Sequence, residues 1–194
     1  DRADDLERIA MNFGPENIAA CIVEPIAGST GTLVPPKGYL QKLRETCDKH
    51  GILLIFDEVI TGWGRTGSSF ASIEYGVTPD IMTMAKATTN GVVPMGVVAC
   101  KDEIYDSVMD ASPMGSVELF HGYTYSGIPV AVAAALAVQD IFEKEDIFNR
   151  AKNLAPYFQK GLFSLQDLES VENIRGYGMM GGIDMKLNTK PGKA

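Results

Sequence analysis

The chain has 194 residues, of which 45% are hydrophobic and 22% charged, and its formal net charge is -8 at pH 7. This length is enough to bury roughly 70% of the unfolded surface, so one large domain, or one domain and part of a second, is expected. The acidic balance argues against a nucleic-acid or anionic-membrane surface, because no basic stretch is present to neutralise phosphates.

The apolar segments are too short to span a bilayer, and none has the layout of a signal peptide. The three cysteines are widely spaced, without a CxxC motif or the histidine pairing that is typical of a metal site. We therefore expect buried, free thiols in a reducing compartment, no bound metal, and a cytoplasmic location.

The first part of the sequence alternates between helical and strand patterns. Apolar spacing predicts a helix over residues 4–13, a buried strand over 19–24, and a helix over 39–50 that ends at Gly51. An irregular, glycine-rich loop separates the strand from the second helix. This order is typical of a parallel sheet with crossover helices.

Two strands in the middle of the chain end in side chains that can carry chemistry. The apolar run over residues 52–56 stops abruptly at Asp57 and Glu58, and a second run over 80–85 ends at Lys86. Runs of this kind predict strands buried on both faces, and open α/β sheets hold their ligands just beyond strand ends. An acid and an amine in one crevice suit pyridoxal phosphate chemistry, in which a lysine forms a Schiff base and an acid keeps the pyridine nitrogen protonated.

The following segment predicts one more strand and three helices. The strand covers residues 96–100, and the first helix runs from Asp102, its predicted cap, to Val108. A long, well-buried helix is expected over residues 126–143, with Pro129 in its first turn.

A further helix over residues 146–165 is amphipathic and contains Pro156, where a kink or break is expected. The stretch 171–185 alternates glycine with apolar residues, as a strand of a different unit would. We therefore assign residues 1–145 to the large domain, and 146–194 to a connecting helix and the beginning of a small domain.

Four motifs follow one another along the chain: VEPIAGSTG from Val23, LLIFDEVITGWGRTG from Leu53, DIMTMAKATTNGVVPMG from Asp80 and HGYTYSGIPVA from His121. Together they resemble the class III, ω-amino-acid type aminotransferases, which are fold type I enzymes. The resemblance implies an α/β fold: part of a three-layer α/β/α large domain, followed by the start of a small C-terminal α+β domain. It also implies pyridoxal 5'-phosphate as cofactor, an amino donor and a keto acid acceptor as substrates, and a homodimer.

By this resemblance, Lys86 is the Schiff-base lysine and Asp57 is the partner of the pyridinium nitrogen. A protonated ring stabilises the carbanion that remains when the substrate Cα proton leaves, and a buried carboxylate keeps the ring protonated. The freed Lys86 amine then moves that proton as general base and acid. Val59 resembles the valine that packs on one ring face, and Ile60 stands where some relatives place a glutamine near the ring hydroxyl.

Two further residues are candidates for cofactor binding by the same resemblance. Glu24 resembles a glutamate at a strand end beside the cofactor, although a pairing with Arg65 or a backbone cap is an equal alternative. Thr124 resembles the threonine that reaches across a dimer interface to the phosphate of the neighbouring subunit's cofactor. Its alternative is a hydroxyl in the turn before the next helix.

The sequence also departs from the family pattern. Ile128 replaces the histidine that is usual in its segment. The phosphate-cradling turn, the aromatic residue that stacks on the other ring face and the arginine that grips a substrate carboxylate lie outside this sequence, and residues 28–31 are no substitute because they do not precede a helix. We therefore expect a fragment, or a natural truncation, of something larger.

The function predicted from these features is transfer of an amino group from an ω-amino acid or amine to a keto acid such as pyruvate. Three alternatives remain open: a non-catalytic remnant of such an enzyme, an aminomutase or decarboxylase of the same family, and a P-loop ATPase with an acidic strand end. The ATPase needs a GxxxxGK[ST] motif, and no segment of the sequence has it.

Overall fold

A four-stranded sheet forms the centre of the molecule. The computed structural model describes residues 3–114, 119 and 121–186. The strands lie in the order β1 (Ala20–Val23), β2 (Leu53–Asp57), β3 (Ile81–Met84) and β4 (Val97–Cys100). The first three are parallel, as predicted, and β4 runs antiparallel to β3.

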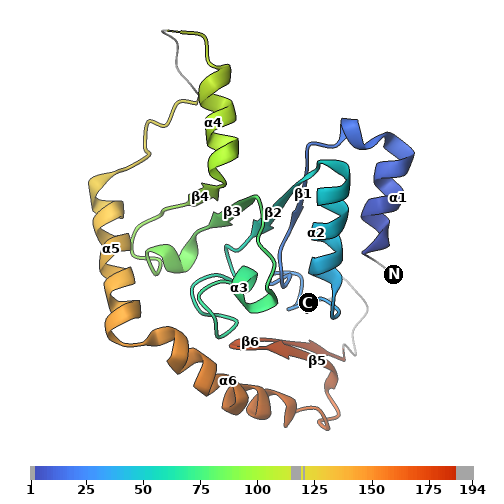
Figure 1. The fold of residues 1–194 in the computed structure, drawn as a ribbon. Coiled ribbons are helices and arrows are strands. Elements are labelled where there is room, and N and C mark those ends of the chain that lie inside the picture. The colour runs from blue at the N-terminus through green and yellow to red at the C-terminus, as the bar shows by residue number, and fades with distance from the viewer. Residues whose placement is uncertain (1–2, 115–118, 120, 187–194) are drawn as a thin grey trace, which may run out of the picture.

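Two helices pack together on one face of this sheet (Figure 1). They are α1 (Asp4–Phe13) and α2 (Tyr39–His50), and α2 ends at the predicted Gly51, which adopts the left-handed conformation at φ 67°. Leu54 and Phe56 of β2 are completely buried against Leu40 and Leu43 of α2. Burial of such side chains stabilises the fold by about 1.5–3 kcal/mol each.

The other face of the sheet is not buried in the same way. The side chain of Ile22 in β1 is 62% exposed, and that of Val98 in β4 is 69% exposed. Along β2, fully buried residues alternate with half-buried ones. The prediction that these strands are buried on both faces is therefore wrong for the described residues, because the core cluster gathers on the α1 and α2 side only.

Two further helices follow the strands. Helix α3 (Ala71–Tyr75) lies between β2 and β3 in sequence, and α4 (Asp102–Ala111) follows β4. Lys101, not Asp102, occupies the N-cap of α4, and Asp102 lies in the first turn. There its carboxylate still suits the positive end of the helix dipole, which explains the misplaced prediction.

Two long helices, α5 (Pro129–Lys144) and α6 (Ile147–Phe163), run along the periphery (Figure 1). Helix α5 begins at Pro129 instead of at residue 126, and the expectation of a well-buried helix is wrong: Val130 and Leu136 are about 60% exposed. Helix α6 continues through Pro156, so the predicted break does not occur. The hydrogen-bonded turns on both sides keep the helix continuous despite the missing amide proton.

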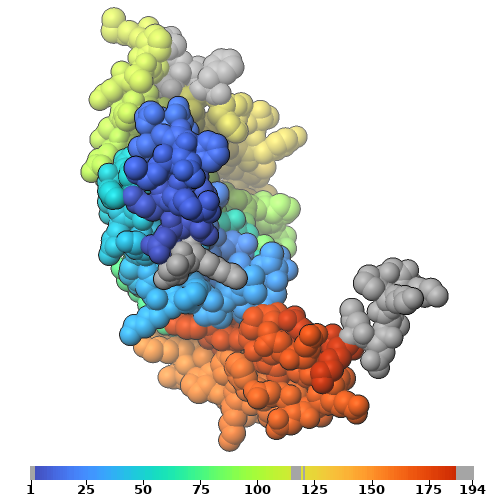
Figure 2. Space-filling view, turned by 90° about the vertical axis from the view of Figure 1, so that its right-hand side faces the viewer, coloured from blue at the N-terminus to red at the C-terminus, as the bar shows by residue number. Residues whose placement is uncertain are grey.

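A separate hairpin closes the described part of the chain. Strands β5 (Val171–Tyr177) and β6 (Met180–Met185) pair antiparallel, and they lie with α6 at the base of the molecule (Figures 1 and 2). Arg175 Nε donates to Gly31 O at 2.7 Å, and the Tyr177 hydroxyl donates to Glu74 Oε1 at 2.6 Å. These bonds attach the hairpin to the loop that follows β1 and to helix α3. The domain boundary at residues 145 and 146 stays a prediction.

Cysteine exposure differs from the expectation at two of the three residues. Cys21, Cys47 and Cys100 are all free, but only Cys47 is buried, while Cys21 is half-buried and Cys100 is exposed at the end of β4. Among the helices described here, none is long and apolar enough to cross a membrane.

Candidate functional site

The predicted acid and lysine lie at the carboxyl ends of adjacent parallel strands. Asp57 is the last residue of β2 and pairs in register with Thr83 of β3. Lys86 follows Thr83 by three residues and begins the short 3₁₀ helix η2 (Lys86–Thr88). At about 3.3 Å per residue, the α-carbons of Asp57 and Lys86 are roughly 10 Å apart at most along the strand direction. The two residues therefore extend past the same edge of the sheet.

Both side chains keep polar atoms available for a ligand. Asp57 Oδ1 accepts a hydrogen bond from the Val59 amide at 3.0 Å, while Oδ2 has no hydrogen-bond partner among the described residues. The exposed Lys86 ammonium has no carboxylate within 4.0 Å in the same part of the chain. A free acid and a free amine at one sheet edge are typical of a binding site in an open α/β sheet.

Lys86 has an unusual backbone conformation. Its φ angle is 47°, in the left-handed region that residues with a Cβ seldom adopt. Such a conformation costs about 1–2 kcal/mol and persists only where neighbouring interactions hold it. Here the Lys86 carbonyl accepts hydrogen bonds from the amides of Thr89 at 3.4 Å and Gly91 at 3.2 Å.

Glu58, directly after Asp57, organises the loop beyond β2. Its side chain is fully buried, and its carboxylate accepts hydrogen bonds from the Thr61 hydroxyl at 3.1 Å and the amides of Ala71 and Ser72 at 2.6 and 2.7 Å. Its own amide donates to Thr83 O at 2.9 Å. Glu58 thus joins the end of β2 to β3 and to the first turn of α3.

The loop after β1 brings two more predicted residues near each other. Glu24 Oε2 accepts a hydrogen bond from the Gly28 amide at 2.9 Å, so of the two structural alternatives the backbone cap is the one observed, and no ion pair joins Glu24 to the described Arg65. A Cβ placed on Gly28 would lie 2.7 Å from Ile60 Cδ1. Ile60 therefore packs directly against this loop.

Thr124 is not brought to the other candidates. It lies exposed in a turn that precedes α5, and no hydrogen bond joins it to Asp57 or Lys86 within the described residues. Its role across a dimer interface stays a prediction. The same holds for the cofactor contacts of Asp57, Val59, Ile60, Glu24 and Lys86.

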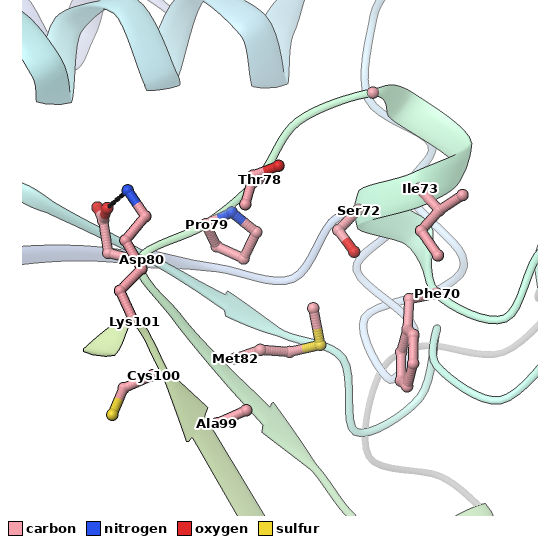
Figure 3. Close-up of a pocket in the computed structure, with 11 residues that line it drawn as sticks. Phe70, Ser72, Ile73, Thr78, Pro79, Asp80, Met82, Ala99, Cys100 and Lys101 are labelled. Carbon is pink, nitrogen blue, oxygen red and sulfur yellow. Dashed lines mark ion pairs between the residues drawn. The ribbon is translucent and has the colours of Figure 1, made fainter. Parts of the chain in front are cut away.

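A hollow lies away from the candidate site, beside the amino end of β3 and the end of β4 (Figure 3). It measures about 590 Å³ and is lined by apolar side chains such as Phe70, Ile73 and Met82. None of the predicted site residues lines it. Its polar end is the Asp80–Lys101 ion pair, at 2.6 Å.

Asp80 shows what a structural carboxylate looks like in this protein. Its oxygens are bound by Lys101, by the Leu54 amide at 2.7 Å and by Arg44 at 2.8 Å. Burial raises the pKa of Asp80, but these three partners outweigh it and leave the pKa below its ordinary value. Asp57 has no such set of partners, which separates the candidate site from this structural one.

Two residues next to the site could not be recognised in advance. The Trp63 indole donates a hydrogen bond to the Thr88 hydroxyl at 3.0 Å, which joins the loop after β2 to η2. Trp63 is the only tryptophan of the chain and stands between two glycines. The lone tryptophan between two glycines marks Trp63 in the sequence, but nothing in the sequence indicates that it binds Thr88.

Comparison with known proteins identifies the family of the chain. A sequence model of the family described as Aminotransferase class-III matches residues 2–193. The chain belongs to this family. Class-III aminotransferases depend on pyridoxal phosphate, and their solved structures share the fold type I architecture seen here in part.

Individual aminotransferases of this family are similar to this chain in sequence. The chain is 54% identical over 190 residues to an omega-aminotransferase of Caulobacter vibrioides, covering 98% of this chain and 43% of that protein. It is 52% identical over 184 residues to a beta-alanine–pyruvate aminotransferase of Pseudomonas aeruginosa, covering 94% of this chain and 41% of that protein. The chain thus spans about two fifths of the length of the curated relatives it matches.

A solved class-III structure superimposes well. An (S)-enantioselective omega-transaminase from Thermomicrobium roseum matches with a TM-score of 0.89 and 42% identity, over 95% of this chain and 40% of that one. The chemistry of the site fits the family's cofactor, because an acid with one oxygen available and an amine without a carboxylate partner are the groups that a pyridine nitrogen and an aldehyde require. At the amino end of β3, by contrast, the acid Asp80 and the amine of Lys101 are paired with each other.

Proposed function

We propose that this chain is the lysine-bearing part of an ω-aminotransferase, with Lys86 holding pyridoxal phosphate as a Schiff base. The observation that supports this most is the placement of Asp57 and Lys86 past the same edge of two adjacent parallel strands. Neither Lys86 nor the second oxygen of Asp57 has a partner among the described residues. Both groups are therefore available to one ligand.

Each residue has a distinct task in this proposal. The bound cofactor supplies an electron sink for negative charge at the substrate carbon. Asp57 keeps a proton on the ring nitrogen through its negative charge, and its Oδ1 is oriented for this by the Val59 amide. Lys86, with its amine freed by the amino donor, would move the donor's Cα proton to the cofactor carbon as general base and then general acid, and would do the reverse on the acceptor. Val59 lies two residues beyond Asp57 and contributes one apolar ring contact.

The names of the relatives support a substrate class for the proposal. Proteins about half identical to this chain are named omega-aminotransferase, beta-alanine–pyruvate aminotransferase and omega-amino acid–pyruvate aminotransferase. We therefore propose an ω-amino acid or amine as donor and a keto acid such as pyruvate as acceptor. A homodimer in which Thr124 reaches the partner's cofactor phosphate, Glu24 and Ile60 beside the cofactor, and a cytoplasmic location complete the proposal.

Other functions predict different results. Family membership removes the support for a P-loop ATPase. An aminomutase or a decarboxylase would use Lys86 and Asp57 in the same way but would not transfer nitrogen to pyruvate. A non-catalytic remnant would bind no cofactor at Lys86.

The decisive experiment is to trap the cofactor on the protein. We expect pyridoxal phosphate to produce a visible absorption band, and borohydride reduction to leave one added mass on the peptide that contains Lys86. Lys86→Ala should remove both signals. The exposed Lys37 provides the matched control, since Lys37→Ala should leave them unchanged. A folded protein with no band at any cofactor concentration would support the remnant.

Amino transfer is tested separately. The protein is incubated with cofactor, β-alanine and pyruvate, and alanine formation is followed. Alanine supports the aminotransferase. Carbon dioxide release, or an amino group moved within the donor, would assign the chain to one of the two alternative chemistries.

A further inference from the structure

A short chain of hydrogen bonds connects Trp63 to the peptide that precedes Lys86. The Trp63 indole N–H donates to Thr88 Oγ1 at 3.0 Å, and the same hydroxyl donates to the carbonyl of Ala85, also at 3.0 Å. We infer that Trp63 is a positioning residue, which fixes the turn at Ala85 and Lys86 through the Thr88 hydroxyl and so aims the lysine amine. This inference rests on the proposed function of Lys86.

The two hydrogen bonds are partly buried. Thr88 is 2% exposed and Trp63 is partly buried. The Thr88 hydroxyl has one proton to donate, and it gives that proton to Ala85 while a lone pair accepts from Trp63. Bonds in such surroundings are stronger than exposed ones, and their loss leaves buried polar groups unpaired.

The turn at Lys86 needs external support. Lys86 lies at a positive φ of 47°, so its backbone would relax if neighbouring bonds were lost. Packing does not provide the support on all sides, because a hollow of about 350 Å³ lies against η2 and is lined by Ala87, Asn90 and Trp63. Side-chain hydrogen bonding from Thr88 therefore adds to the backbone hydrogen bonds that hold the turn.

Trp63 itself is held by its own loop and by the distant helix α5. Its ring lies 5.0 Å from that of Phe70 and 5.7 Å from that of Phe142 in α5, measured between centroids. Its amide donates to Ser69 O at 2.6 Å. Trp63 thus connects the loop after β2 and helix α5 to the turn at Ala85 and Lys86.

The expected effects are specific to the lysine turn. Thr88→Val keeps the size of the side chain but removes both bonds, and Trp63→Phe keeps the aromatic stacking but removes the N–H. Each variant should slow trapping of pyridoxal phosphate on Lys86 by about tenfold, the change expected for loss of a buried hydrogen bond. Thr88→Ser retains the hydroxyl and should restore the wild-type rate. Thr30→Val, at an exposed threonine, is the matched control.

A second measurement needs no cofactor. Amide hydrogen exchange over residues 85–91 should become faster in Thr88→Val and Trp63→Phe, and not in Thr88→Ser or Thr30→Val. Trp63 is the only tryptophan in the chain, so its emission should also shift in Thr88→Val. Urea unfolding of each variant separates these local effects from a general loss of stability.

The outcomes distinguish the two proposals. If wild-type protein forms no adduct on Lys86, the proposed function fails, while hydrogen exchange still decides whether Trp63 and Thr88 hold the turn. Where the adduct forms, unchanged trapping and exchange in both Thr88→Val and Trp63→Phe would overturn the inference. If the variants are less stable to urea but trap the cofactor on Lys86 at the normal rate, the inference also fails, and the contact between Trp63 and Thr88 serves stability alone.

Discussion

Asp57 and Thr83 are register partners on parallel strands β2 and β3, and the Glu58 amide extends the pairing by donating to Thr83 O at 2.9 Å. Because Lys86 follows Thr83 by three residues, this one pairing fixes how far the lysine can lie from the acid. A slip of one residue would also turn Asp57 to the opposite face of the sheet. The register of two strands thus determines the geometry of the candidate site.

Glu58 should be essential for stability although it belongs to a charged residue type. Glu58→Gln replaces one acceptor oxygen with an NH₂ group that must face a donor, Thr61, Ala71 or Ser72. We expect the free energy of unfolding to fall by about 1–3 kcal/mol, as for a buried group left unpaired. Urea unfolding measures this, with Glu45→Gln at an exposed site as the control. Equal stability of the two variants would contradict the role assigned to Glu58.

Asp80 should make the protein sensitive to acid. Its pKa is lowered in the folded state, so its stabilising effect is complete above the unfolded pKa of about 4 and disappears as pH falls through the lower folded value. Asp80→Asn should destabilise the fold by about 3 kcal/mol near neutral pH and flatten the loss of stability in acid. Urea unfolding at a series of pH values tests both effects.

The control for Asp80 uses the same arginine. Asp48 also pairs with Arg44, at 2.7 Å, but its side chain is 64% exposed. Asp48→Asn should therefore change stability by less than about 1 kcal/mol at any pH. A similar loss in both variants would show that burial of Asp80 is not the deciding factor.

Cys21 should react at a lower pH than an ordinary thiol. A hydrogen bond from Cys47 lowers the pKa of Cys21 to about 7, against the opposing effect of burial. Alkylation of Cys21 should therefore rise with a midpoint near that pH. Cys47→Ala should raise the Cys21 midpoint. A Cys21 profile that stays the same in Cys47→Ala, read from peptide masses, would exclude the hydrogen bond.

The hairpin turn should tolerate no side chain at Gly178. A Cβ there would lie 2.5 Å from the carbonyl oxygen of Arg65, and φ is 57°. Gly51 has a similar φ of 67° but nothing within 4 Å of its Cβ position, so Gly51→Ala isolates the conformational strain. We expect Gly178→Ala to destabilise by about 1–3 kcal/mol more than Gly51→Ala, because of overpacking. Thermal unfolding of both variants measures the difference.

Local pattern was sufficient for several elements. The helices α1 and α2 were predicted with their observed bounds, and β2 ends at the predicted Asp57, whereas β3 ends at Met84, two residues before Lys86. Apolar spacing and the glycine stop of α2 act over a few residues, so they can be read directly from sequence. Errors arose where burial mattered, as for the exposed face of α5, since an apolar helix gives no sign of what lies against it.

The sequence by itself determined the family, the order of the elements and the acid and lysine at two strand ends, because these depend on residue type and short-range spacing. Tertiary structure alone decided which groups are paired. The Glu24 carboxylate binds the Gly28 amide and does not pair with Arg65. Asp80 accepts hydrogen bonds from three donors, and Trp63 donates to Thr88, which lies 25 residues further along the chain. Such pairings come from the packing of distant segments, whose register and burial no local pattern specifies.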